Sequence, residues 1–132
     1  MIDVLNELMP HELTQHVFQT VDSARPGSIA ELFTEDATMV FGNADPLVGR
    51  EAITAGIQGF FATINGLQHR IINDWHIGTD TGADTIAETE VTYHRLDDKY
   101  VSVPVVSIWH TRDDGLITDY RVFFDLTPVY AP

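Results

Sequence analysis

The sequence predicts an α+β fold in which three N-terminal helices pack on one face of a curled antiparallel sheet. Apolar residues recur at helical spacing in the first half of the 132-residue chain, whereas runs rich in β-branched and aromatic residues fill the second half. Two of these runs flank Arg112-Asp113-Asp114-Gly115, and Asp-Gly supplies the positive φ that a tight hairpin turn needs. We therefore expect one domain over residues 1–132, with helices first and a meander of four long strands after them.

Three helices are expected in the first half, after a short helical lead-in at residues 1–9. The first runs from Pro10 to about residue 24, because proline suits the first turn of a helix. Its apolar residues form one narrow stripe at helical spacing: Leu13, Val17, Val21 and Ala24. The second helix is short, with a buried face of Ile29, Leu32 and Phe33. The third spans about 50–64 and ends at Asn65-Gly66.

Strands are expected wherever β-branched and aromatic residues gather, because these side chains suit a pleated surface. The expected ranges are 37–41, 47–48, 68–78, 85–96, 100–111 and 116–126. The last strand alternates clearly, since its apolar residues share one side: Tyr120, Val122, Phe124 and Leu126. One face of this sheet can thus line a core while the other meets solvent or a partner.

Composition narrows the function classes. Seven basic and twenty acidic residues give a net charge of −13, which repels phosphate backbones and anionic membranes. The chain has no cysteine, which excludes disulfides, thiolate metal sites and a cysteine nucleophile. No apolar run approaches the roughly 20 residues of a membrane helix, and the N-terminus lacks the basic start of a signal peptide. We expect a cytoplasmic protein that binds neither nucleic acid nor membrane.

Several motifs in order along the chain resemble a known family. They are Leu32-Phe33-Thr34-Glu35-Asp36-Ala37-Thr38, Gly49-Arg50-Glu51-Ala52-Ile53, Gly115-Leu116-Ile117 and Phe123-Phe124-Asp125-Leu126. Together they resemble the SnoaL-like group of the nuclear-transport-factor-like superfamily of cone-shaped α+β barrels. The resemblance implies a conical pocket between the concave face of the sheet and the helices, and a homodimer formed through the sheet.

Two mechanisms of this superfamily lack their residues here. Ketosteroid isomerase uses a carboxylate base and an oxyanion hole of tyrosine and protonated aspartic acid. Phe41 stands at the position of that base and Ser107 near that of the aspartic acid. Limonene epoxide hydrolase uses an Asp-Arg-Asp set, whose positions match Glu90, Thr92 and Val122. The resemblance therefore does not extend to either reaction.

The site of scytalone dehydratase is a closer match. That family has a histidine in a segment that resembles the surroundings of His69, and a second histidine 25 positions later, which matches His94. An aspartate near the end of the first helix matches Asp22. The two family tyrosines, however, match Val21 and Phe41. The resemblance thus preserves an Asp-His-His set without the two phenols.

This set suggests general acid–base chemistry. A histidine can take a proton from carbon or oxygen when a carboxylate orients its other nitrogen. We expect His69 to be the base, Asp22 its orienting partner, and His94 or Tyr120 the acid, in a lyase or isomerase that needs no cofactor. Its substrate would be a small hydrophobic or polyketide-like molecule in an apolar pocket, lined by Phe41, Phe60, Val105, Trp109, Val122 and Phe124.

Two questions stay open from the sequence. In strand 85–96, hydrophobicity favours an inward face that includes Val91 and Tyr93, whereas the family resemblance favours the face of Glu90 and His94. We follow the resemblance, which makes Glu90 a further pocket residue and candidate acid or base. The alternative function is a non-catalytic binding or structural domain. We expect no metal site, because no zinc-binding spacing is present.

Overall fold

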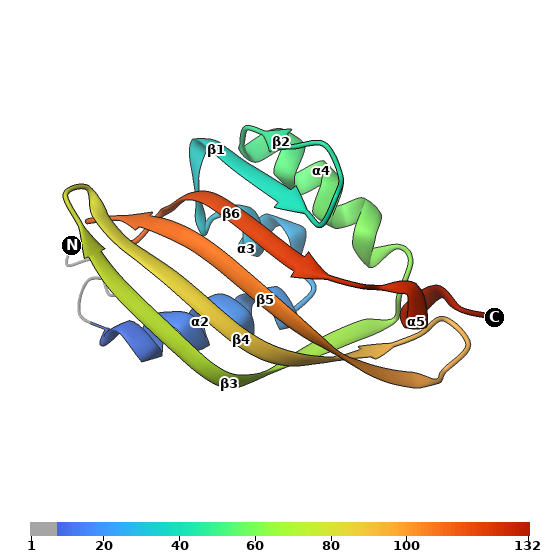
Figure 1. Ribbon diagram of the computed structural model, residues 1–132. Coiled ribbons are helices and arrows are strands. Elements are labelled where there is room, and N and C mark those ends of the chain that lie inside the picture. Colours follow the sequence, from blue (N-terminus) through green and yellow to red (C-terminus); the bar gives the residue numbers. More distant parts are fainter. Residues whose placement is uncertain (1–7) are drawn as a thin grey trace.

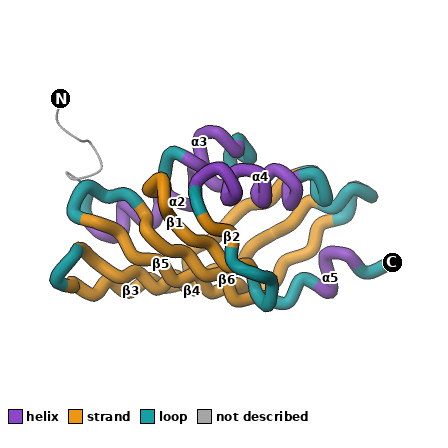
Figure 2. Tube along the Cα trace, turned by 90° about the horizontal axis from the view of Figure 1, so that it is seen from above, coloured by secondary structure: helices purple, strands orange, loops and turns teal. Residues whose placement is uncertain are grey.

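One six-stranded sheet forms one layer of the molecule, and helices cover one of its faces (Figures 1 and 2). The computed structural model describes residues 8–132, so most of the expected lead-in at 1–9 lies outside it. The helices are α2 (Pro10–Asp22), α3 (Pro26–Ala30), α4 (Arg50–Phe61) and α5 (Thr127–Tyr130). The strands are β1 (Phe33–Phe41), β2 (Leu47–Val48), β3 (Gly66–Thr79), β4 (Gly82–His94), β5 (Tyr100–Arg112) and β6 (Ile117–Phe124).

The sheet has the order β2-β1-β6-β5-β4-β3. The four long strands β3 to β6 form the predicted antiparallel meander, and Gly115 turns β5 into β6 with a φ of +84°. β1, however, lies parallel to β6, with Thr38 beside Asp119 and Phe41 beside Val122. The sheet is therefore mixed and open, and the expectation of a wholly antiparallel barrel is wrong.

The second helix is shorter than predicted. α3 ends at Ala30, and Phe33 is already the first residue of β1 rather than part of a helical face. Phe33 lies opposite Ile117 of β6, and its carbonyl oxygen accepts a hydrogen bond from the Arg50 guanidinium. These partners are distant in sequence, so local periodicity could not reveal that the strand begins here.

α2, α3 and α4 sit over the concave side of the sheet (Figure 2). α2 directs Thr14, Val17 and Phe18 into the core, and α4 does the same with Ile53 and Ile57. α2 lies along β3, whereas α3 and α4 lie near β1. Because the two helical groups contact different parts of the bent sheet, space remains between them, and the candidate site lies there.

Candidate active site

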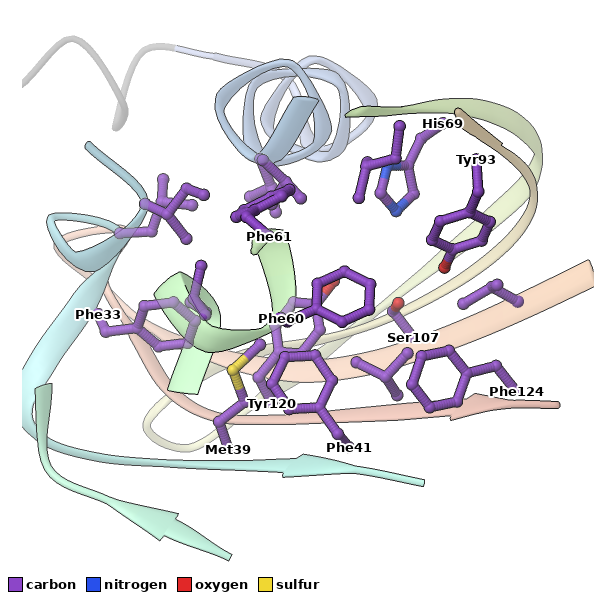
Figure 3. Close-up of a pocket in the computed structure, with 18 residues that line it drawn as sticks. Phe33, Met39, Phe41, Phe60, Phe61, His69, Tyr93, Ser107, Tyr120 and Phe124 are labelled. Atoms are coloured by element: carbon purple, nitrogen blue, oxygen red, sulfur yellow. The ribbon is translucent and has the colours of Figure 1, made fainter. Parts of the chain in front are cut away.

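A cavity of about 60 Å³ lies between the sheet and the helices (Figure 3). Its wall is largely apolar and draws on α2, α3, α4 and five strands. Of the expected site residues, seven border this cavity: Phe41, Phe60, His69, Val105, Tyr120, Val122 and Phe124. Rings dominate one side, because Phe41 stacks on both Phe60 and Phe124 at centroid distances of 5.9 and 6.3 Å.

Asp22 and His69 meet at the wall of this cavity. Asp22 is the last residue of α2, and His69 lies in the adjacent strand β3. The His69 ring nitrogen Nδ1 lies 2.7 Å from Asp22 Oδ1, and the His69 backbone N–H donates to Asp22 Oδ2 over 3.0 Å. Both carboxylate oxygens thus hold one residue, which fixes the position of the strand as well as the orientation of the ring.

The hydrogen bond to Asp22 also sets the chemistry of the imidazole. A carboxylate oxygen accepts, so Nδ1 of the neutral ring carries the proton and Nε2 has a free lone pair. Phe18 stacks on the ring at 4.3 Å with an interplanar angle of 16°, and the His69 side chain is only 9% exposed. Figure 3 shows the ring bordering the cavity. The arrangement is that of an oriented base with Nε2 available to a ligand.

Three hydroxyl groups supply most of the other polarity of the cavity wall, namely those of Tyr93, Ser107 and Tyr120. Burial raises the pKa of both tyrosines well above the usual value, so the phenols are protonated and can donate hydrogen bonds at neutral pH. Tyr93 and Ser107 were missed as site residues. The signal for Tyr93 was present in the sequence, in the apolar alternation of strand 85–96.

Glu90 and His94 lie on the opposite face of β4 from Tyr93, so their expected place in the pocket is wrong. Successive side chains of a strand point to opposite faces, and the buried set is Ala87, Thr89, Val91 and Tyr93. Glu90 instead pairs with Arg70, at 3.3 Å. His94 Nε2 lies 3.0 Å from Asp98 Oδ1. His94 therefore does not share the cavity with His69, and hydrophobic alternation was the better guide than the family resemblance.

Trp109 lies behind the cavity wall rather than in it. Its indole stacks on Tyr120 at 5.2 Å and meets the edge of Phe18 at 5.6 Å. On its other side Trp109 borders a second cavity of about 80 Å³. Trp109 was expected to line the pocket, but it does not border the first cavity, and the indole instead supports the rings that form the wall.

Two further features of residues 8–132 bear on the class of protein. No group of three or more histidine, cysteine or acidic side chains there is arranged to hold a metal ion. None of the helices in this part of the chain is long and apolar enough to cross a membrane.

Comparison with known proteins identifies the family. The sequence profile of the SnoaL-like domain matches residues 14–120, and the chain therefore belongs to the SnoaL-like family. No curated protein matches the chain significantly.

Solved structures share the fold at low sequence identity. A protein from Catenulispora acidiphila DSM 44928 with a ketosteroid isomerase-like fold has a TM-score of 0.79 and 21% identity, over 94% of this chain and 92% of its own. A candidate isomerase from Bacillus subtilis has a TM-score of 0.74 and 20% identity, over 98% of this chain and 96% of its own. A candidate SnoaL-like polyketide cyclase from Jannaschia sp. CCS1 has a TM-score of 0.73 and 20% identity, over 98% of this chain and 94% of its own. At these identities the similarity shows the ketosteroid isomerase-like fold.

Proposed function

We propose that the protein is an enzyme of isomerase or lyase type that removes a proton from a small, largely apolar molecule without a cofactor. One observation carries the proposal: His69 is held by Asp22 at the wall of an apolar cavity, with Nε2 available to a ligand. The names of structural relatives, an isomerase and a polyketide cyclase, are consistent with this reaction class.

In the proposed reaction, His69 Nε2 takes a proton from the substrate and becomes part of an imidazolium. Asp22 compensates the new positive charge through the 2.7 Å contact to Nδ1. In an isomerisation, the same imidazolium returns the proton to another atom of the substrate. In a lyase reaction a leaving group needs an acid, and the buried phenol of Tyr120 is the candidate on the facing wall.

The size of the cavity limits the substrate. One water molecule needs roughly 10–15 Å³ on this measure, so a cavity of about 60 Å³ has room for roughly four to six waters or a ligand of a few heavy atoms. A ring-sized or polyketide-like substrate requires the stacked side chains of Phe41, Phe60 and Phe124 to move apart. We therefore propose small aliphatic compounds as first substrates to test.

A non-catalytic binding domain is the second candidate, and the small, mainly apolar cavity favours it. This candidate gives no reason for both Asp22 oxygens to hold His69, or for Nε2 to border the cavity. The two candidates differ in one measurable property, because only the enzyme accelerates the exchange of a carbon-bound proton with solvent.

The test is a deuterium-exchange assay. The protein is incubated in deuterium oxide with small ketones, aldehydes, esters and nitroalkanes, and the loss of carbon-bound protons is followed by NMR. We expect exchange with at least one class, and a fall of about 10²–10⁴-fold in His69→Gln, the usual contribution of a general base. His94→Gln is the matched control, because His94 also contacts an aspartate but lies on the other face of β4. Equal exchange rates in His69→Gln and wild type would refute the assignment.

We also propose a homodimer formed through the outer face of the sheet. Trp75, Ile86 and Ile108 are register neighbours across β3, β4 and β5, and they lie on the face turned away from the helices. Trp75 and Phe123 on this face are each about half exposed. A contiguous row of large apolar side chains on an exposed face marks an interaction surface. In a two-fold symmetric dimer, the second copy covers this row with its own identical row.

A further inference from the structure

Tyr93 is a largely buried residue whose hydroxyl faces the cavity. Tyr93 lies in β4, and only 3% of the residue is exposed. Its ring is held edge-on by Phe60 at 6.3 Å. Figure 3 shows the phenolic oxygen turned toward the interior of the site. A tyrosine buried in this way normally satisfies its hydroxyl with a partner.

No protein group satisfies this hydroxyl among the described residues. Burial is the main cause of the raised pKa of Tyr93, with smaller contributions from Tyr130, Tyr120 and Asp22, and no hydrogen bond contributes. No side-chain nitrogen or oxygen of the described residues is fully buried without a partner, so the Tyr93 hydroxyl, which has none, is open to the cavity that Tyr93 lines. A ligand in the cavity that brings an acceptor can therefore pair with this donor. Tyr120 differs, because the neighbouring Ser107 side chain lowers the pKa of its phenol and partly offsets the raising effect of burial.

The strand register places Tyr93 next to His69. Leu67 pairs with Tyr93, and His69 pairs with Val91, so His69 and Tyr93 are diagonal neighbours on the same inward face. Diagonal neighbours of an antiparallel pair are about 7–8 Å apart at Cα, within reach of long side chains. One small ligand can thus meet both the imidazole and the phenol.

From this geometry we propose that Tyr93 binds the carbonyl oxygen of the substrate, which makes the substrate a small apolar ketone or aldehyde with a hydrogen on the adjacent carbon. The inference rests on the proposed function and adds its substrate class. His69 Nε2 takes the proton as the carbon–hydrogen bond breaks. The electron pair of that bond forms a carbon–carbon double bond, and the carbonyl electrons move to the oxygen. The Tyr93 O–H donates a hydrogen bond to the resulting enolate oxygen.

The apolar cavity explains why a single donor suffices. Inside a poorly solvated site, a hydrogen bond to developing charge is worth more than in water, and the donor is already in place. A raised pKa keeps Tyr93 in the donor form throughout the neutral range, so the site does not lose its donor at working pH. The enolate is then protonated at carbon by the imidazolium, which regenerates the base.

Acetone and isobutene are suitable probes, because they have the same shape and differ in whether an oxygen or a methylene group completes the double bond. We expect the infrared carbonyl band of acetone bound to wild type to lie at lower frequency than that of free acetone. The shift is retained in His69→Gln and lost in Tyr93→Phe. The ratio of the binding affinities for acetone and isobutene should be about three- to tenfold higher in wild type than in Tyr93→Phe, which is the usual value of one neutral hydrogen bond.

The exchange assay gives an independent measurement. Tyr93→Phe is expected to slow deuterium exchange of acetone by about 10²–10³-fold, the effect of removing one oxyanion donor. Tyr100→Phe is the matched control, because Tyr100 is an exposed tyrosine on β5. Its band and exchange rate should equal those of wild type. Thermal unfolding and circular dichroism check that Tyr93→Phe, which keeps the ring, retains the fold.

The outcomes separate this inference from the proposed function. A shifted band that persists in Tyr93→Phe overturns the assignment of Tyr93, whatever His69 does. Unchanged exchange in His69→Gln overturns the proposed function, while the band still tests Tyr93. Absence of bound acetone in wild type at millimolar concentration also overturns the carbonyl assignment.

Discussion

Substituting Asp22 by asparagine tests the central contact of the candidate site. The substitution keeps the shape of the side chain but replaces one acceptor oxygen by an NH₂ donor. In the wild type both oxygens accept, one from Nδ1 and one from the backbone N–H of His69. Asparagine therefore leaves one of these donors facing another donor, or forces the His69 proton from Nδ1 to Nε2. In either case the base is impaired.

The magnitude follows from burial. A buried hydrogen-bonding group that loses its partner costs about 1–3 kcal/mol. The Asp22 side chain is 21% exposed, so water can replace part of the lost interaction. We therefore expect the free energy of unfolding to fall by the lower half of that range, about 1–2 kcal/mol. Proton-exchange activity should fall much further, since the base loses its orientation and its counter-charge.

Urea unfolding measures the loss of stability, and the nitrogen chemical shifts of His69 report the tautomer. Asp98→Asn is the control, because Asp98 contacts a histidine in the same way but its side chain is 82% exposed. That substitution should change stability by less than about 0.5 kcal/mol. A double-mutant cycle of Asp22→Asn with His69→Ala should show a coupling of about 0.5–3 kcal/mol. If both aspartate variants behave alike and His69 keeps its Nδ1 proton, the reasoning is refuted.

Three further predictions concern stability at acid pH, the formation of the proposed dimer and the size of the cavity. Asp74 has a lowered pKa, because hydrogen bonds from His76 and His11 outweigh the raising effect of burial. Its contribution to stability is thus fully present above the unfolded pKa of about 3.9 and is lost as pH falls below that value. Urea unfolding at a series of pH values should show that the free energy of unfolding falls less below pH 4 in Asp74→Asn than in wild type. An equal fall in the two proteins would contradict this. Ile108→Glu should convert the proposed dimer into monomer in sedimentation experiments, and a wild type that is monomeric at micromolar concentration would exclude that dimer. Phe60→Ala should cost about 2–3 kcal/mol, less than for a fully buried phenylalanine, and create room for benzene. Benzene should then raise the melting temperature of the variant but not of wild type, and an equal response of the two proteins would show that Phe60 does not limit the cavity.

Features encoded locally could be predicted well from the sequence. The Asp114-Gly115 turn and its two flanking strands appear at the expected positions, because turn chemistry and β-branched content are properties of adjacent residues. The first helix likewise begins at Pro10 and ends within two residues of the predicted position, at Asp22. The parallel pairing of β1 with β6 could not be predicted in this way, because it joins segments about 80 residues apart.

Strand β4 shows how two sources of inference conflict. The alternation of Val91 and Tyr93 with polar residues indicated the inward face correctly, because burial of apolar area dominates side-chain placement. The family resemblance indicated the other face and led to Glu90 and His94. A one-residue shift reverses every side chain of a strand, so a distant alignment with a small error in this region gives the wrong face. The same error concealed Tyr93.

A histidine–aspartate contact alone is weak evidence for a site in so acidic a chain. With twenty acidic residues, several other histidines also contact an aspartate, in the pairs His11–Asp74, His76–Asp74, His94–Asp98 and His110–Asp84. What distinguishes His69 is the environment of its second nitrogen. In His76 both ring nitrogens have hydrogen-bonding contacts, to Asp74 and Thr85, and in His110 they contact Asp84 and Thr81.

His69 has one nitrogen held by a carboxylate while its ring borders an apolar cavity. Contacts to both ring nitrogens occupy His76 and His110, and the side chains of His11 and His94 are more exposed than that of His69. In His69 the single contact orients the ring and leaves Nε2 to the ligand. The environment of the second nitrogen, rather than the presence of a carboxylate, therefore separates a candidate base from a structural histidine in this protein. This criterion needs tertiary structure, which is why the sequence could select His69 only together with His94.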